Sequence, residues 1–143
     1  MKKLIALILV IATAAVLLVG CADGKKITDH TWRMSLAQTD GGQIVAFDPA
    51  SEVDASYFEG AKEVELILQA KGRKLTLTDN TSGKVYEGKF KKSESDEKTV
   101  SYTVKIEESK GTAVVTTADF GDGELVPTMF LSIGGYSMSF RVR

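Results

Sequence analysis

Apolar and polar residues alternate along most of the chain after Thr31. In the first run, Trp32, Met34 and Leu36 fall on one face. The other regular runs cover residues 63–69, 74–78, 99–106 and 136–143, and less regular runs cover 43–47, 84–91, 112–118 and 127–133. A period of two is typical of strands with one buried face, and no long helical period follows Cys21. The pattern predicts an all-β domain of about nine strands over residues 31–143.

Short turns separate these runs. Each turn contains glycine, often next to Asp, Asn or Ser, which suits the positive φ angles of tight hairpins. The turns lie at residues 40–42, 71–72, 79–83, 109–111 and 134–135. Short connections make consecutive strands antiparallel neighbours, whereas a sandwich needs longer crossovers. The expected fold is an antiparallel up-and-down meander that closes into a small barrel of about 8–9 strands, because closure leaves no free sheet edge.

Residues 48–62 form the one connection that is long enough for an obvious crossover. Asp48 can cap a helix and Pro49 suits its first position, so a short helix is expected there. Tyr57 and Phe58 give this segment an apolar end. Two interpretations remain open: a lid over the mouth of the barrel, or a turn that packs its aromatic residues onto the barrel end.

The residues expected inside the barrel are large. They are Trp32, Met34, Leu66, Leu68, Tyr86, Phe90, Tyr102, Ile106, Leu131, Met138 and Phe140. If all of them point inward, their side chains leave little space, so a filled core is favoured over a cavity. A cavity would instead hold one small apolar molecule, which Trp32 and Tyr102 could contact.

The first 20 residues differ from the rest of the chain. Lys2 and Lys3 are their only charges, and residues 4–19 are apolar apart from Thr13. This apolar stretch of 16 residues is shorter than the roughly 20 of a spanning helix, so it indicates a secretory signal. The expected organisation is a signal peptide over 1–20, a tether over 21–30 and the barrel over 31–143. Without the leader, 16 basic and 19 acidic residues give a formal charge of −3.

Leu18-Val19-Gly20-Cys21 resembles the lipobox of bacterial lipoproteins. The resemblance implies cleavage between Gly20 and Cys21 and a covalent diacylglyceryl or acyl lipid, such as palmitate, on Cys21. Acyl chains hold a protein on a bilayer without spanning it, at about 0.8 kcal/mol for each buried CH₂. The expected location is the cell membrane or the outer membrane, facing away from the cytoplasm.

The domain as a whole is similar to bacterial lipocalin-like lipoproteins. Trp32 near the start of the first strand and the hairpin sequence at 75–80 carry this resemblance, which implies a small barrel. Lipocalins have glycine two residues before that tryptophan, where this chain has His30. They also have an arginine on the last strand that packs over the tryptophan. Here Arg141 and Arg143 lie on the last strand, but on the face opposite Phe140.

The composition restricts the chemistry. One cysteine and one histidine in 143 residues exclude an internal disulfide, a thiolate cluster and a histidine-rich metal site. Asp119, Asp122 and Glu124 could offer oxygen ligands to Ca²⁺, but the Ca²⁺-loop pattern is absent, so a solvated turn is expected and no metal. No acid–base or nucleophilic constellation is evident, so no enzyme activity is expected. A formal charge of −1 argues against nucleic-acid binding.

A second, weaker resemblance suggests another class of protein. Ser82-Gly83-Lys84-Val85-Tyr86 is similar to the Ser-Gly-x-x-Tyr motif of membrane-bound lysozyme inhibitors. It implies that Ser82, Gly83 and Tyr86 could enter a lysozyme cleft. Three functions are therefore considered: an anchored lipoprotein that contacts an envelope or extracellular partner, a lipocalin-like binder of a small hydrophobic ligand, and a hydrolase inhibitor.

Overall fold

The computed structural model describes residues 26–51, 55–119 and 121–142, and these contain ten strands and two short 3₁₀ helices. The strands are β1 (Trp32–Thr39), β2 (Ile44–Phe47), β3 (Lys62–Glu63), β4 (Leu66–Lys71), β5 (Lys74–Asp79), β6 (Lys84–Ser95), β7 (Val100–Ile106), β8 (Ser109–Asp119), β9 (Leu125–Ile133) and β10 (Tyr136–Val142). The helices are η2 (Ile27–Asp29) and η3 (Ala55–Phe58).

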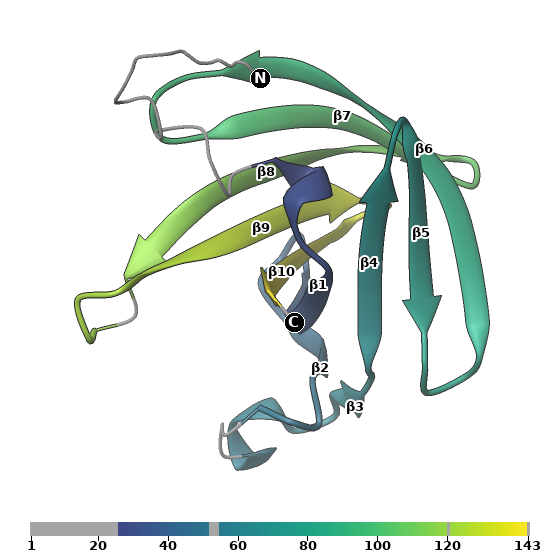
Figure 1. Cartoon of the computed structure of the whole chain (residues 1–143). Coiled ribbons are helices and arrows are strands. Elements are labelled where there is room, and N and C mark those ends of the chain that lie inside the picture. Colours follow the sequence, from purple (N-terminus) through teal and green to yellow (C-terminus); the bar gives the residue numbers. More distant parts are fainter. Residues whose placement is uncertain (1–25, 52–54, 120, 143) are drawn as a thin grey trace.

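Eight of the strands close into an antiparallel barrel. Strands β4 to β10 pair in chain order, as Figure 1 shows, and β10 then pairs with β1. The wall closes where Trp32 and Arg33 of β1 pair with Leu68 and Ile67 of β4. The predicted all-β barrel is confirmed. Short turns explain the meander, because each one places a strand beside the strand that precedes it in the chain.

Strands β2 and β3 are additions to the eight-stranded wall. β2 pairs with the second half of β1, with Phe47 opposite Leu36, beyond the short segment in which β1 pairs with β4. β3 pairs in parallel with β2, so the intervening residues form the crossover that the sequence predicts. In Figure 1, β2, β3 and η3 project from one side of the barrel.

The helix in this crossover does not begin where the sequence places it. The helical turn η3 begins at Ala55, whereas the prediction of a helix from Pro49 is wrong. Asp48 caps a tight turn instead, because its Oδ1 atom accepts a hydrogen bond from the Ala50 amide at 3.0 Å. Its two carboxylate oxygens are also bound by Arg33, which holds Asp48 against β1 rather than at a helix end.

A bulge in β1 changes which residues face the interior. Met34 lies opposite Phe140 and Leu36 lies opposite Ser139, so Ser35 is an extra residue in β1. An extra residue reverses the alternation beyond it. Leu36 therefore faces outward and Ala37 is buried, which corrects the prediction that Trp32, Met34 and Leu36 share one face.

One end of the barrel is closed by the residues before β1. Ile27 of η2 is fully buried in the core. The Trp32 Nε1 atom donates a hydrogen bond to the Ile27 carbonyl at 2.8 Å, and the Ile27 amide donates one to the Tyr102 hydroxyl at 3.1 Å. Burial raises the pKa of that hydroxyl. These two bonds satisfy polar groups that would otherwise be buried without partners, so η2 forms a fixed plug.

Candidate ligand site at the open end of the barrel

The other end of the barrel is a hollow that we call the cup. It has a volume of about 490 Å³ and lies opposite the η2 plug. Its apolar wall residues come from seven of the eight barrel strands, from β2 and from the link between β3 and β4. They are Met34, Ala37, Ala46, Val64, Leu66, Leu77, Tyr86, Ile106, Ile133, Tyr136 and Met138. Five of these residues are buried, and the other six, of which Tyr136 is the most exposed, give the cup an apolar surface that is partly accessible from solvent.

The interior is thus filled at one end only, and the prediction of a fully filled barrel is corrected. All the residues expected inside do belong to the core or pack against it. At the closed end Trp32, Leu68 and Phe140 are fully buried. At the open end, the bulge removes Leu36 from the interior and brings in Ala37, which pairs with Ala46 of β2. Ala37 and Ala46 thus occupy this region, in which Leu36 was expected, and their small side chains leave part of it empty.

Asp79 and Glu107 are the two charged residues among those that line the cup. Asp79 ends β5, and its carboxylate accepts hydrogen bonds from the Thr81 and Ser82 amides at 2.9 and 3.1 Å. Burial alone would raise the pKa of Asp79, but hydrogen bonds from Ser82 and Thr81 lower it below its usual value. Glu107 has a φ of 55°, and its Oε2 atom accepts a hydrogen bond from the Glu87 amide at 3.2 Å.

The residues predicted to contact a ligand or form a lid lie elsewhere. Trp32 and Tyr102 belong to the closed end, where both are buried. Phe58 stacks on Phe47, with ring centroids 5.2 Å apart, and lines a groove on the outer wall rather than the cup. Nothing is described for the side chain of Tyr57. Gly20 and Cys21 lie outside the described residues.

The residues of the inhibitor-like motif lie at the open end. Ser82 and Gly83 belong to the turn between β5 and β6, and the Ser82 hydroxyl donates a hydrogen bond to Asp79 at 2.8 Å. Gly83 has a φ of 81°, which explains the glycine. The ring of Tyr86 lines the cup, and Lys84 Nζ lies 5.9 Å from its centroid. The motif therefore forms a hairpin turn together with part of the cup wall.

The acidic turn between β8 and β9 is held by its own backbone. Asp119 accepts hydrogen bonds from the Gly121 and Gly123 amides at 2.8 and 3.0 Å, which lower the pKa of its carboxyl. Asp122 binds the Glu124 amide in the same way. Among the described residues, no three His, Cys, Asp or Glu side chains are placed to share a metal ion. Nor is any helix in those ranges long and apolar enough to span a membrane.

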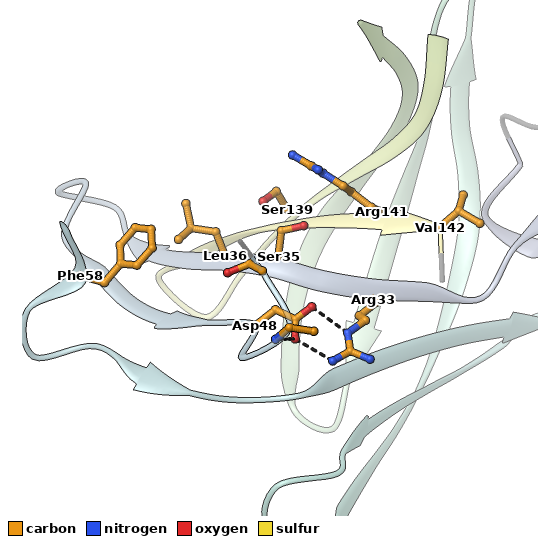
Figure 2. Close-up of a pocket in the computed structure, with 10 residues that line it drawn as sticks. Arg33, Ser35, Leu36, Asp48, Phe58, Ser139, Arg141 and Val142 are labelled. Carbon is orange, nitrogen blue, oxygen red and sulfur yellow. Dashed lines mark hydrogen bonds and ion pairs between the residues drawn. The ribbon is translucent and has the colours of Figure 1, made fainter. Parts of the chain in front are cut away.

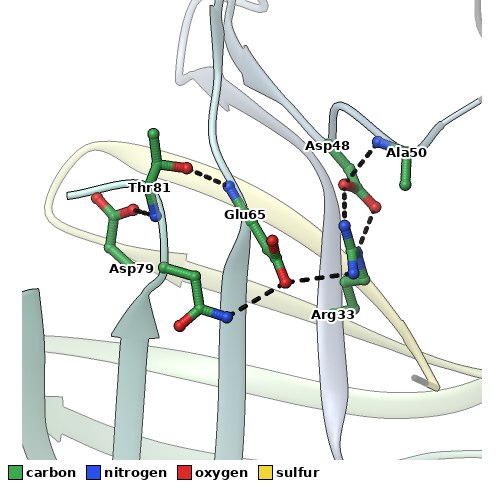
Figure 3. Close-up of polar contacts among 7 residues, drawn as sticks. Arg33, Asp48, Ala50, Glu65, Asp79 and Thr81 are labelled. Carbon is green, nitrogen blue, oxygen red and sulfur yellow. Dashed lines mark hydrogen bonds and ion pairs between the residues drawn. The ribbon is translucent and has the colours of Figure 1, made fainter. Parts of the chain in front are cut away.

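The outer wall carries an ion-pair network that sequence reasoning missed. Arg33 Nε and Nη2 donate to the two carboxylate oxygens of Asp48, each at 2.7 Å, and Nη1 lies 3.4 Å from Glu65. Figure 3 shows Glu65 between this pair and the turn that contains Thr81. Hydrogen bonding to Arg33 lowers the pKa of Asp48. Fifteen positions separate Arg33 from Asp48, so no local pattern indicates the pair.

Beside this pair lies the groove on the outer wall, about 610 Å³ in volume. Figure 2 shows Phe58 and Leu36 toward one end and Val142 toward the other, with Ser35 and Ser139 between them. The Arg33–Asp48 pair bounds one side. Because this pair joins the start of the crossover to β1, we assign it a structural role.

Replacing Asp48 by asparagine tests that role through its pH dependence. The folded-state pKa of Asp48 is lowered, so its contribution to stability is present above the unfolded pKa of about 4 and is lost as the pH falls through the folded value. We expect Asp48→Asn to lower the free energy of unfolding by about 1.5–3 kcal/mol at pH 7, and by less near pH 3. Urea titrations across this pH range measure the difference. Asp40→Asn, in an exposed turn, should change neither value; an Asp48→Asn effect that is independent of pH would contradict the assignment.

The chain matches no protein-family model, no curated protein and no solved structure at a significant level. Inferences about its function therefore rest on the geometry of the barrel.

Proposed function

We propose that the protein is a lipid-anchored, non-enzymatic binding protein of the bacterial cell envelope, and that its barrel takes a small hydrophobic ligand at the open end. The observation that carries this proposal is the apolar cup of about 490 Å³. Binding sites for small molecules typically measure about 300–1,000 Å³ and are lined mostly by apolar side chains. The cup has both properties.

The physical reason is the cost of leaving the cup wetted. Apolar surface removed from water contributes roughly 25 cal/mol per Å². The partly exposed wall residues gather this surface in one hollow, where a single ligand could cover it. Below the cup, Trp32 and Phe140 close the floor, so a ligand can enter from one end only. A ligand that inserts an apolar group from the rim would cover the walls, and its polar part would lie near Asp79 and Glu107.

The ligand site is tested by filling it. Ala46 lines the cup and is half-buried, so leucine at this position should occupy the space without disturbing the closed end. We expect the domain without its leader to enhance the fluorescence of N-phenyl-1-naphthylamine, and Ala46→Leu to weaken this binding about tenfold, which corresponds to 1.4 kcal/mol. Ala50→Leu adds the same side chain on the outer wall and serves as the control. Equal binding by both variants, or no binding by the wild type, would refute the proposal.

The anchor rests on the lipobox-like sequence that ends at Cys21. The described chain begins at Lys26, next to the Ile27 plug, and five residues span at most about 17 Å. An anchor at Cys21 would thus hold the closed end near the bilayer and leave the open end accessible to a ligand or to an envelope partner. Cys21→Ala is expected to move the protein from the membrane fraction to the soluble fraction, and its retention in the membrane would exclude a lipid anchor.

A further inference from the structure

Five lysines lie side by side across the outer wall of the barrel, one from each of the strands β4 to β8. In register, Lys71 pairs with Lys74, Lys74 with Lys89, Lys89 with Lys105, and Lys105 with Lys110. Directly paired residues of antiparallel strands point to the same face. Four of these residues are exposed and Lys105 is partly exposed. We call this set the lysine row.

The positions facing the interior confirm that the row points outward. Leu75 follows Lys74 and is buried, Val104 and Ile106 flank Lys105 and are buried, and Phe90 follows Lys89 and packs on the core. None of the five lysines forms an ion pair with the described part of the chain, in which Arg33 holds Asp48 and Glu65. Glu87 is the nearest acidic residue along β6, two positions from Lys89. Asp29 lines a hollow together with Lys71 and Lys74, and Glu107 and Glu108 form the turn between the strands of Lys105 and Lys110, so acidic residues border the row without forming an ion pair with it.

This arrangement opposes folding. Like charges directly opposite each other on neighbouring strands destabilise a sheet, and the row contains four such pairs in succession. Any neutral polar residue would serve at these outward positions. What the row does provide is a positively charged surface, which attracts a group of opposite charge.

The shape of the row indicates what kind of partner fits it. Four strand spacings of about 4.8 Å give a length of about 19 Å. The row spans four of the eight spacings between strands in the closed wall, which is half of its circumference (Figure 1), so the lysines project in diverging directions. A flat membrane can meet only part of such a curved line, whereas a flexible chain with repeated anionic groups can follow all of it. We propose that the lysine row binds a flexible linear polyanion, a second function independent of the cup.

Short-chain polyphosphate, fluorescently labelled, is the probe for this proposal. Each phosphate contact releases counterions, so we expect the wild-type affinity to fall on the order of 100-fold between about 50 and 200 mM salt. The double variant Lys89→Gln/Lys105→Gln removes the centre of the row and should bind about tenfold more weakly at the lower salt concentration, with a shallower salt dependence. Its melting temperature should be equal to or above that of the wild type, because two repulsive residues are gone.

The control is Lys62→Gln/Lys98→Gln, which changes the net charge equally at exposed positions away from the row. It should bind within about twofold of the wild type. Equal losses in both double variants would show an effect of overall charge and overturn the proposal, as would no binding of polyphosphate by the wild type. Phosphatidylglycerol vesicles and oligothymidylate complete the test. Stronger, row-dependent binding to the vesicles would overturn the proposal and assign the row to a membrane surface. Oligothymidylate is also a flexible polyanion, so row-dependent binding no tighter than that of polyphosphate would support the proposal, whereas a preference for the oligonucleotide would show recognition of its bases or sugars and overturn it.

Discussion

Replacing Trp32 by alanine is expected to lower the free energy of unfolding by about 3–5 kcal/mol, a large part of the roughly 5–15 kcal/mol typical of a whole domain. Trp32 is fully buried, and its Nε1 atom holds the Ile27 carbonyl at 2.8 Å. The truncation leaves a cavity and also frees η2, which closes this end of the barrel. The measurement is urea denaturation followed by far-ultraviolet circular dichroism, since Trp32 is the only tryptophan in the chain.

Two further variants divide this effect into its parts. Trp32→Phe keeps most of the volume but loses the bond to Ile27, so we expect a loss of about 1–2 kcal/mol. Phe130→Ala removes an aromatic ring that is half exposed on the outer wall and should cost less than about 1 kcal/mol. If Trp32→Ala were no more destabilising than Phe130→Ala, the closed end would not be the stable part of the barrel that its burial indicates.

Replacing Gly111 by alanine is expected to destabilise the fold by about 3 kcal/mol, although the change adds one methyl group. A Cβ atom at this position would overlap the carbonyl oxygen of Ser132 on β9 and lie 2.8 Å from Ile133 Cβ. Gly111 pairs with both Val104 and Ile133, so β8 would have to move away from a neighbouring strand. Gly88 of β6 meets the same obstacle from the carbonyl of Lys105 and should behave in the same way.

The matched control is Gly41→Ala in the turn between β1 and β2. Its φ lies outside the left-handed region, and the nearest atom to an added Cβ is Thr39 Oγ1 at 3.8 Å. We expect a change within about 0.5 kcal/mol. Thermal melts of the Gly111, Gly88 and Gly41 variants, monitored by circular dichroism, give the comparison. A Gly111→Ala protein as stable as Gly41→Ala would show that β8 and β9 can separate without loss.

Much of the fold follows from local pattern. Alternation marks strands because only one face of each is buried, and glycine-rich turns such as Gly134-Gly135 join neighbouring strands. The same pattern placed Trp32 and Phe140 inside the barrel, where the structure has them. The cup could be predicted only in part. Met34, Leu66 and Tyr86 were expected inside, but nothing local shows that one end stays open.

The tertiary structure decided what depends on pairing between distant segments. The extra residue at Ser35 exists only relative to β10, and it sends Leu36 outward and Ala37 inward. The addition of β2 to β1 brings Ala46 to the cup, and the ion pair between Arg33 and Asp48 fastens the crossover. The lysine row has the same origin, because charges far apart in the chain become neighbours only when four strand registers are set. Sequence alone determined the strands, their turns and the buried face of most of them. Register and bulges, which depend on the competition among many distant partners, determined the cup and the lysine row.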